Sequence, residues 1–106
     1  MTMLLDLDFP NNVENTSIKV LLIEDDEDDY LITEDTLEDI PGQDYELTWV
    51  SEFDRAVDAI ETFNDYDVVL VDFYIGKSTG LELLHLARAK DVRSPIIMLT
   101  GVSDRD

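Results

Sequence analysis

Three short apolar runs of this chain end on side chains that can do chemistry. They are residues 18–23 before Glu24 and Asp25, residues 68–71 before Asp72, and residues 96–99 before Thr100. Near-continuous apolar runs of this length are typical of strands in a parallel sheet that helices cover on both faces. The carboxyl ends of such strands share one edge of the sheet, where ligands bind. We therefore expect three carboxylates and one hydroxyl to lie together at that edge.

Three carboxylates at close range repel one another unless a cation lies among them. An all-oxygen ligand set with few positions suits Mg²⁺, which shares its remaining coordination with water and phosphate oxygens. The helix dipole offers an alternative explanation, worth about 0.3–1 kcal/mol for each acid in a first helical turn. That explanation covers residues 26–29 better than Glu24 and Asp25. An EF-hand is excluded, because no Gly stands at the sixth position of a loop that starts at Asp25 or Asp26.

Asp72 and Thr100 each have a chemical and a structural interpretation. Beside Mg²⁺, the Asp72 carboxylate can attack a phosphoryl group and form an acyl phosphate. A Thr100 hydroxyl at the next strand end can then hydrogen-bond a phosphoryl oxygen. As structural residues, Asp72 would cap a neighbouring helix and Thr100 would be an ordinary strand terminus.

The rest of the pattern predicts the elements that position these side chains. Strands are expected at residues 18–23, 45–50, 67–72 and 96–100, and helices at about 26–40, 53–63 and from near 79, with a loop at 73–78. The order predicts a parallel sheet with right-handed crossovers. The buried stripe of the first helix is predicted at Ile32, Thr36 and Ile40, with Leu37 beside them. Gly80, in the first turn of the third helix, is expected to let the backbone approach its neighbours closely. Residues 1–17 are expected to form a flexible arm.

Composition narrows the class of protein. The 106 residues suffice for one domain, and the absence of Cys excludes disulfides and thiolate metal sites. A formal net charge of −19, from 26 acids and 7 bases, disfavours direct binding to nucleic acid or to an anionic membrane. No apolar run approaches the roughly 18 residues of a membrane span. We expect a cytoplasmic protein.

The chain resembles the receiver domain of two-component response regulators in three segments taken together, which are residues 21–26, 70–72 and 95–100. The spacing from Asp72 to Gly80, followed by Leu-Glu-Leu-Leu at 81–84, is similar to that family's stretch after its phosphorylated Asp. The resemblance covers roughly residues 18–106. It implies the flavodoxin-like α/β fold, a parallel sheet with helices on both faces and strand order 2-1-3-4 for the strands present.

The resemblance also implies a role for each site residue. Asp72 would be the phospho-acceptor, and Thr100 would be the switch hydroxyl that moves toward the phosphoryl group. Asp25 and Asp72 would bind Mg²⁺ directly, Glu24 would act mainly through water, and the backbone carbonyl of Tyr74 would complete the protein's share. The phosphoryl group would come from a sensor histidine kinase or a phosphotransfer protein. Such a chain is a signalling domain that assists its own phosphorylation, not a conventional enzyme.

The sequence departs from the family pattern in two places. Gly76 stands where many receivers have Pro, so we expect a more mobile loop after the acceptor. The chain also ends at Asp106, before the family's last helix, strand and helix and the Lys on that strand. Residues 18–106 are therefore expected to be a receiver without its C-terminal α-β-α portion. Its fourth strand would then have a bare edge, through which we expect homodimers.

The sequence leaves two alternatives open. Asp6 and Asp8 resemble the Asp-x-Asp opening of haloacid-dehalogenase-like phosphatases, with Asp6 as nucleophile and Asp8 as general acid. The apolar run before Asp6 is short for the buried strand of that family. The other alternative is a receiver-like interaction module that is never phosphorylated.

Overall fold

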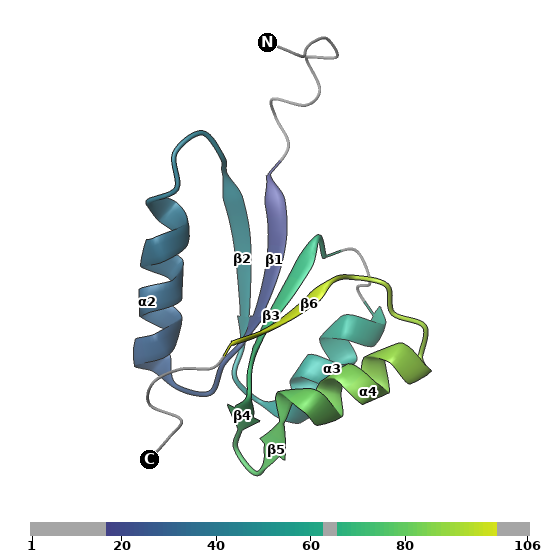
Figure 1. The fold of residues 1–106 in the computed structure, drawn as a ribbon. Helices are drawn as coiled ribbons and strands as arrows, with labels where there is room; N and C mark the ends of the chain where they lie inside the picture. Colours follow the sequence, from purple (N-terminus) through teal and green to yellow (C-terminus); the bar gives the residue numbers. More distant parts are fainter. Residues whose placement is uncertain (1–16, 63–65, 100–106) are drawn as a thin grey trace, which may run out of the picture.

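A four-stranded parallel sheet forms the centre of the molecule, as the computed structural model describes it for residues 17–62 and 66–99 (Figure 1). The strand order is β2-β1-β3-β6, which confirms the predicted flavodoxin-like α/β fold with order 2-1-3-4. The elements are β1 (Ile18–Ile23), α2 (Glu27–Glu38), β2 (Tyr45–Val50), α3 (Phe53–Thr62), β3 (Val68–Asp72), β4 (Tyr74–Ile75), β5 (Ser78–Thr79), α4 (Gly80–Ala89) and β6 (Ile96–Leu99). Apart from Ser17, the predicted arm lies outside the described residues.

The main core lies between the sheet and the helix pair α3 and α4, on the opposite side from α2 (Figure 1). Alternate residues of β1 and β3 point into it, as the two-residue period of a strand requires. The residues that these four elements bury there are Leu21, Ile23, Val69 and Val71 from the strands, and Ala56, Ile60, Leu83 and Ala87 from the helices. Each buried large aliphatic side chain contributes about 1.5–3 kcal/mol. This core holds the strands that carry the acidic residues.

The predicted buried stripe of α2 is wrong. Ile32 is 63% exposed and Ile40 is 41% exposed, and Thr36 is also exposed. The helix ends at Glu38 with no fully buried side chain. Its half-buried side is instead the line of Tyr30 and Leu37, because the Tyr30 ring stacks on Trp49 of β2 at a centroid distance of 4.1 Å.

The predicted loop at residues 73–78 is partly ordered as a hairpin. β4 and β5 pair antiparallel, with Tyr74 opposite Thr79 and Ile75 opposite Ser78. The turn between them is Gly76-Lys77, and Gly76 has φ +60°. The hairpin lies at the edge of the sheet where β3 ends (Figure 1). It therefore borders the predicted site.

No helix in the described ranges 17–62 and 66–99 is long and apolar enough to cross a membrane.

Candidate functional site

Three carboxylates meet at the C-terminal edge of the sheet. Glu24 and Asp25 follow β1 directly, and Asp72 is the last residue of the neighbouring strand β3. The parallel register pairs Ile23 with Val71, so the chain reaches Glu24 and Asp72 at the same level. One carboxylate oxygen from each of the three residues lies within 4.8 Å of the others. The structure thus brings together the three acids that the sequence placed at one edge.

The three acids differ in their exposure to solvent. Glu24 and Asp72 are 3% and 7% exposed, whereas Asp25 is exposed. The pKa of Glu24 is raised to about 7, mainly by burial and in part by the negative charges of Asp72, Asp29 and Asp25. The backbone N–H of Asp26 donates to Glu24 Oε2 at 3.2 Å and acts in the opposite direction on that pKa. The cluster therefore favours a bound proton or cation over three bare charges.

Asp25 is oriented by the hairpin after β3. The backbone N–H of Gly76 donates to Asp25 Oδ2 at 2.8 Å. A Pro at this position would have no N–H to donate, and its fixed φ near −65° differs from the +60° found here. In the sequence, Gly76 stands out only as a departure from the family pattern, and nothing there indicates this contact. The greater mobility expected of this segment stays a prediction.

The first turn of α4 lies directly against the end of β3. Gly80 N–H donates to the carbonyl of Phe73 at 2.7 Å, and a Cβ atom on Gly80 would lie 2.8 Å from the backbone oxygen of Asp72. This confirms the close approach expected at Gly80. Thr79 is the N-cap of α4, with a capping box to Glu82. The N-cap residue of α2 is Asp26.

Of the two remaining predicted site residues, the structure describes Tyr74 and does not describe Thr100. Tyr74 lies in β4, two residues after Asp72, with its side chain half exposed and its ring packed edge-on against Phe73 at 4.7 Å. Thr100 lies outside the described residues, as do Asp6 and Asp8 of the phosphatase alternative.

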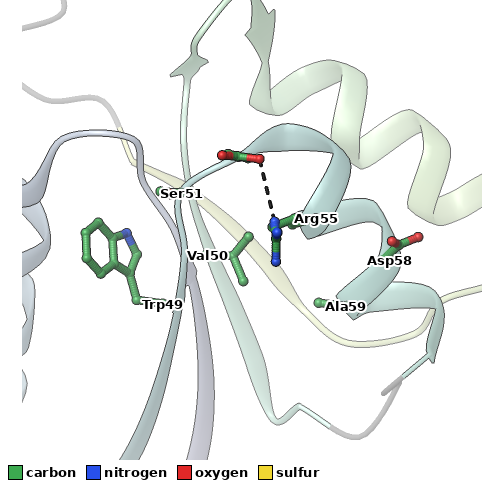
Figure 2. A pocket seen from close by; sticks show the side chains of 7 residues that line it. Trp49, Val50, Ser51, Arg55, Asp58 and Ala59 are labelled. Carbon is green, nitrogen blue, oxygen red and sulfur yellow. Dashed lines mark ion pairs between the residues drawn. The ribbon is translucent and has the colours of Figure 1, made fainter.

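A separate open pocket lies beside the end of β2 (Figure 2). It contains none of the three clustered acids. Its ion pair, Arg55 with Glu52 at 3.6 Å, joins two side chains that are 78% and 70% exposed, a kind of pair that contributes little to stability. The lining residues are Trp49, Val50, Ser51, Glu52, Arg55, Asp58 and Ala59. We therefore assign the candidate site to the carboxylate cluster and not to this pocket.

Solved structures of receiver domains share this fold. The signal receiver domain of a Luxo repressor protein from Vibrio parahaemolyticus is 22% identical, with a TM-score of 0.69 over 84% of this chain and 67% of that one. The receiver domain of the Francisella response regulator 1452 is 27% identical, with a TM-score of 0.68 over 81% and 68%. The phosphorylated cyanobacterial phytochrome response regulator RcpA is 21% identical, with a TM-score of 0.68 over 86% and 71%.

The sequence itself identifies the family. No curated protein matches the chain. The family described as "Response regulator receiver domain" matches residues 20–106, a range that includes Glu24, Asp25, Asp72 and Thr100 and leaves out Asp6 and Asp8. With the fold and the acidic cluster in agreement, the chain belongs to the response regulator receiver domains.

Proposed function

We propose that this chain accepts a phosphoryl group on Asp72 in a Mg²⁺-dependent reaction and thereby switches a downstream output. The observation that carries the proposal is the approach of Glu24, Asp25 and Asp72 to within 4.8 Å of one another at the sheet edge. Receiver domains are signalling domains and not conventional enzymes. We infer the same role here, in the cytoplasm.

The donor set of the cluster fits Mg²⁺. Three carboxylates from adjacent strands offer hard oxygen ligands, and Asp25 leaves the cluster open to water on one side. Asp25 and Asp72 would hold the ion directly and Glu24 through water, with the Tyr74 carbonyl as a further ligand. The bound ion would neutralise the carboxylates and the oxygens of the incoming phosphoryl group.

The proposed phosphoryl transfer is a single displacement at phosphorus. A carboxylate oxygen of Asp72 attacks the phosphorus of a phosphohistidine, the nitrogen–phosphorus bond breaks, and the imidazole leaves. An acyl phosphate remains on Asp72, and the Thr100 hydroxyl is proposed to donate a hydrogen bond to it as the switch. The donor would be a sensor histidine kinase or a phosphotransfer protein. The net charge of −19 favours a basic docking surface on that donor.

Acetyl phosphate with Mg²⁺, followed by intact mass measurement, tests the proposal. The chain should gain the mass of one phosphoryl group, and Asp72→Asn or removal of Mg²⁺ with a chelator should abolish the gain. Asp58→Asn is a matched control, since this exposed acid lies on α3, outside the cluster. Modification that persists in Asp72→Asn would refute the assignment.

Mg²⁺ binding without any modification would make the chain a silent interaction module. Release of phosphate from a generic monoester, lost in Asp6→Asn, would instead indicate a phosphatase.

A further inference from the structure

The end of β2 makes two hydrogen bonds to the backbone of Glu24, one with its N–H and one with its carbonyl. The Glu24 N–H donates to the carbonyl of Val50 at 3.1 Å, which continues the parallel ladder by one residue. The Glu24 carbonyl accepts the indole Nε1–H of Trp49 at 2.6 Å. Beyond the end of a strand, a backbone carbonyl no longer accepts a hydrogen bond from the backbone of the neighbouring strand. Here the side chain of Trp49 on that strand donates the hydrogen bond instead.

The indole is itself fixed by α2. The rings of Trp49 and Tyr30 stack at 4.1 Å with an angle of 4° between their planes. The Tyr30 hydroxyl donates to Glu34 Oε2 at 3.2 Å, one turn further along the helix. Figure 2 shows the indole on one side of β2 and the side chains of Val50 and Arg55 on the other. The donor nitrogen is thus held by a stacked ring from a second element.

This arrangement fixes the backbone that carries two of the three clustered acids. Glu24, Asp25 and Asp72 repel one another while no cation is bound, and this repulsion tends to displace the backbone at the end of β1. The Trp49 bond holds the backbone from which Glu24 and Asp25 project. Without it, a cation would have to reassemble its ligands on binding, and its affinity would fall.

We propose that Trp49 is a positioning residue for the carboxylate cluster, acting through its indole N–H on the Glu24 carbonyl. The inference rests on the proposed function, because it takes the cluster to be a Mg²⁺ site. The sequence pattern does not reveal it. Trp49 lies in a strand with alternating polar residues, and its partner is a backbone atom 25 residues away.

The test replaces Trp49 with β-(3-benzothienyl)alanine, which keeps the shape and stacking of the bicyclic ring and lacks the N–H. Mg²⁺ alone is titrated into the full 106-residue chain by calorimetry. We expect a Kd about 3- to 10-fold weaker than in the native chain, the range that follows from losing one hydrogen bond. Tyr45→Phe, at the opposite end of β2, is the matched control and should leave the Kd unchanged.

A second variant separates positioning from general stability. Tyr30→Leu removes the stacked ring and keeps the indole donor, so it should lower the thermal midpoint more than the benzothienyl substitution and weaken Mg²⁺ less. If both variants weaken Mg²⁺ in proportion to their loss of stability, Trp49 has only a structural role and the inference is overturned. Native Mg²⁺ affinity in the benzothienyl variant also overturns it and leaves the proposed function standing. If the native chain binds no Mg²⁺, both proposals fail.

Discussion

Gly80 approaches Asp72 more closely than any residue with a side chain could. A Cβ atom at position 80 would lie 2.8 Å from the backbone oxygen of Asp72 and 3.3 Å from a methyl carbon of Val71. The first contact is with backbone, which cannot rotate away as a flexible side chain can. The N-terminus of α4 is therefore seated directly against the strand end that carries the proposed phospho-acceptor.

Gly80→Ala should consequently destabilise the chain by about 1–3 kcal/mol, the usual cost of inserting a methyl group into a filled site. Urea unfolding measures this loss. The same substitution should weaken Mg²⁺ binding, because the end of β3 must shift. Gly42→Ala is the control: its φ of +82° makes it strained, but nothing lies within 4 Å of the added carbon. It should lose stability and keep its Mg²⁺ affinity. Native stability in Gly80→Ala would contradict the close approach.

Gly76 should tolerate Ala far better than Pro. Gly76→Ala keeps the N–H that donates to Asp25. It should lower the free energy of unfolding only by the roughly 1–2 kcal/mol that a residue with a side chain costs in the left-handed conformation. Gly76→Pro removes the donor and cannot adopt φ +60°. We expect Mg²⁺ affinity within about twofold of native for the Ala variant. For the Pro variant we expect it to be at least about tenfold weaker, because a hydrogen bond to a charged group is lost. Calorimetric titration measures both. Equal weakening in the two variants would show that the N–H is not what orients Asp25.

Without Mg²⁺, the chain should become less stable as the pH rises from about 4.5 to about 7. Burial raises the pKa of Glu24 to about 7 in the folded chain, against an ordinary value of 4.5. Between these two values the folded state retains a proton that the unfolded state has released, so the free energy of unfolding falls with rising pH. The expected contribution is about 3 kcal/mol, because each pKa unit corresponds to about 1.4 kcal/mol. It is complete below pH 4.5 and is lost as the pH passes 7.

Urea midpoints measured across this range, with a chelator present, give that dependence. Glu24→Gln removes the titrating group and should flatten the curve between these limits. Because other acids also titrate, the relevant quantity is the difference between the native chain and this variant. Parallel curves for the two proteins would mean that Glu24 ionises normally in the folded chain.

Mg²⁺ should stabilise the folded chain by mass action. At ten times its Kd, a ligand that binds only the folded state raises the free energy of unfolding by about 1.4 kcal/mol. The thermal midpoint should rise accordingly, return on addition of a chelator, and respond weakly in Asp72→Asn. NaCl at matched ionic strength controls for screening of the net charge of −19. An equal rise with NaCl would leave no evidence for a specific ion at the cluster.

The sheet and its acidic edge could be predicted from the sequence because both depend on local pattern and one topological rule. Apolar runs of four to six residues predict buried strands, and parallel strands bring their carboxyl ends together. That reasoning needs no knowledge of side-chain contacts. It placed Glu24, Asp25 and Asp72 at one edge, where the structure has them.

The packing of α2 could not be predicted in this way. Its apolar residues at four-residue spacing suggested a stripe through Ile32, which is 63% exposed. The orientation of the helix follows instead from the stacking of Tyr30 on Trp49, a contact between residues 19 positions apart. The roles of Trp49 and Gly76 were missed for the same reason. Each acts through one hydrogen bond to a residue distant in sequence, and neither bond leaves a periodic pattern.

In the part of the chain that the structure describes, β6 lies at one edge of the sheet. Within the described residues β6 pairs with β3 alone, and Ile97 on this strand is 52% exposed. An apolar strand at a sheet edge is a template for pairing with another chain. We therefore expect light scattering to show a dimer that forms as the protein concentration rises. Ile97→Lys should shift the chain toward monomer, because a charge on an edge strand opposes such pairing. Ile32→Lys, which places the same charge on the exposed face of α2, should leave the dimer intact. A native chain that stays monomeric at every concentration would show that β6 does not pair between copies.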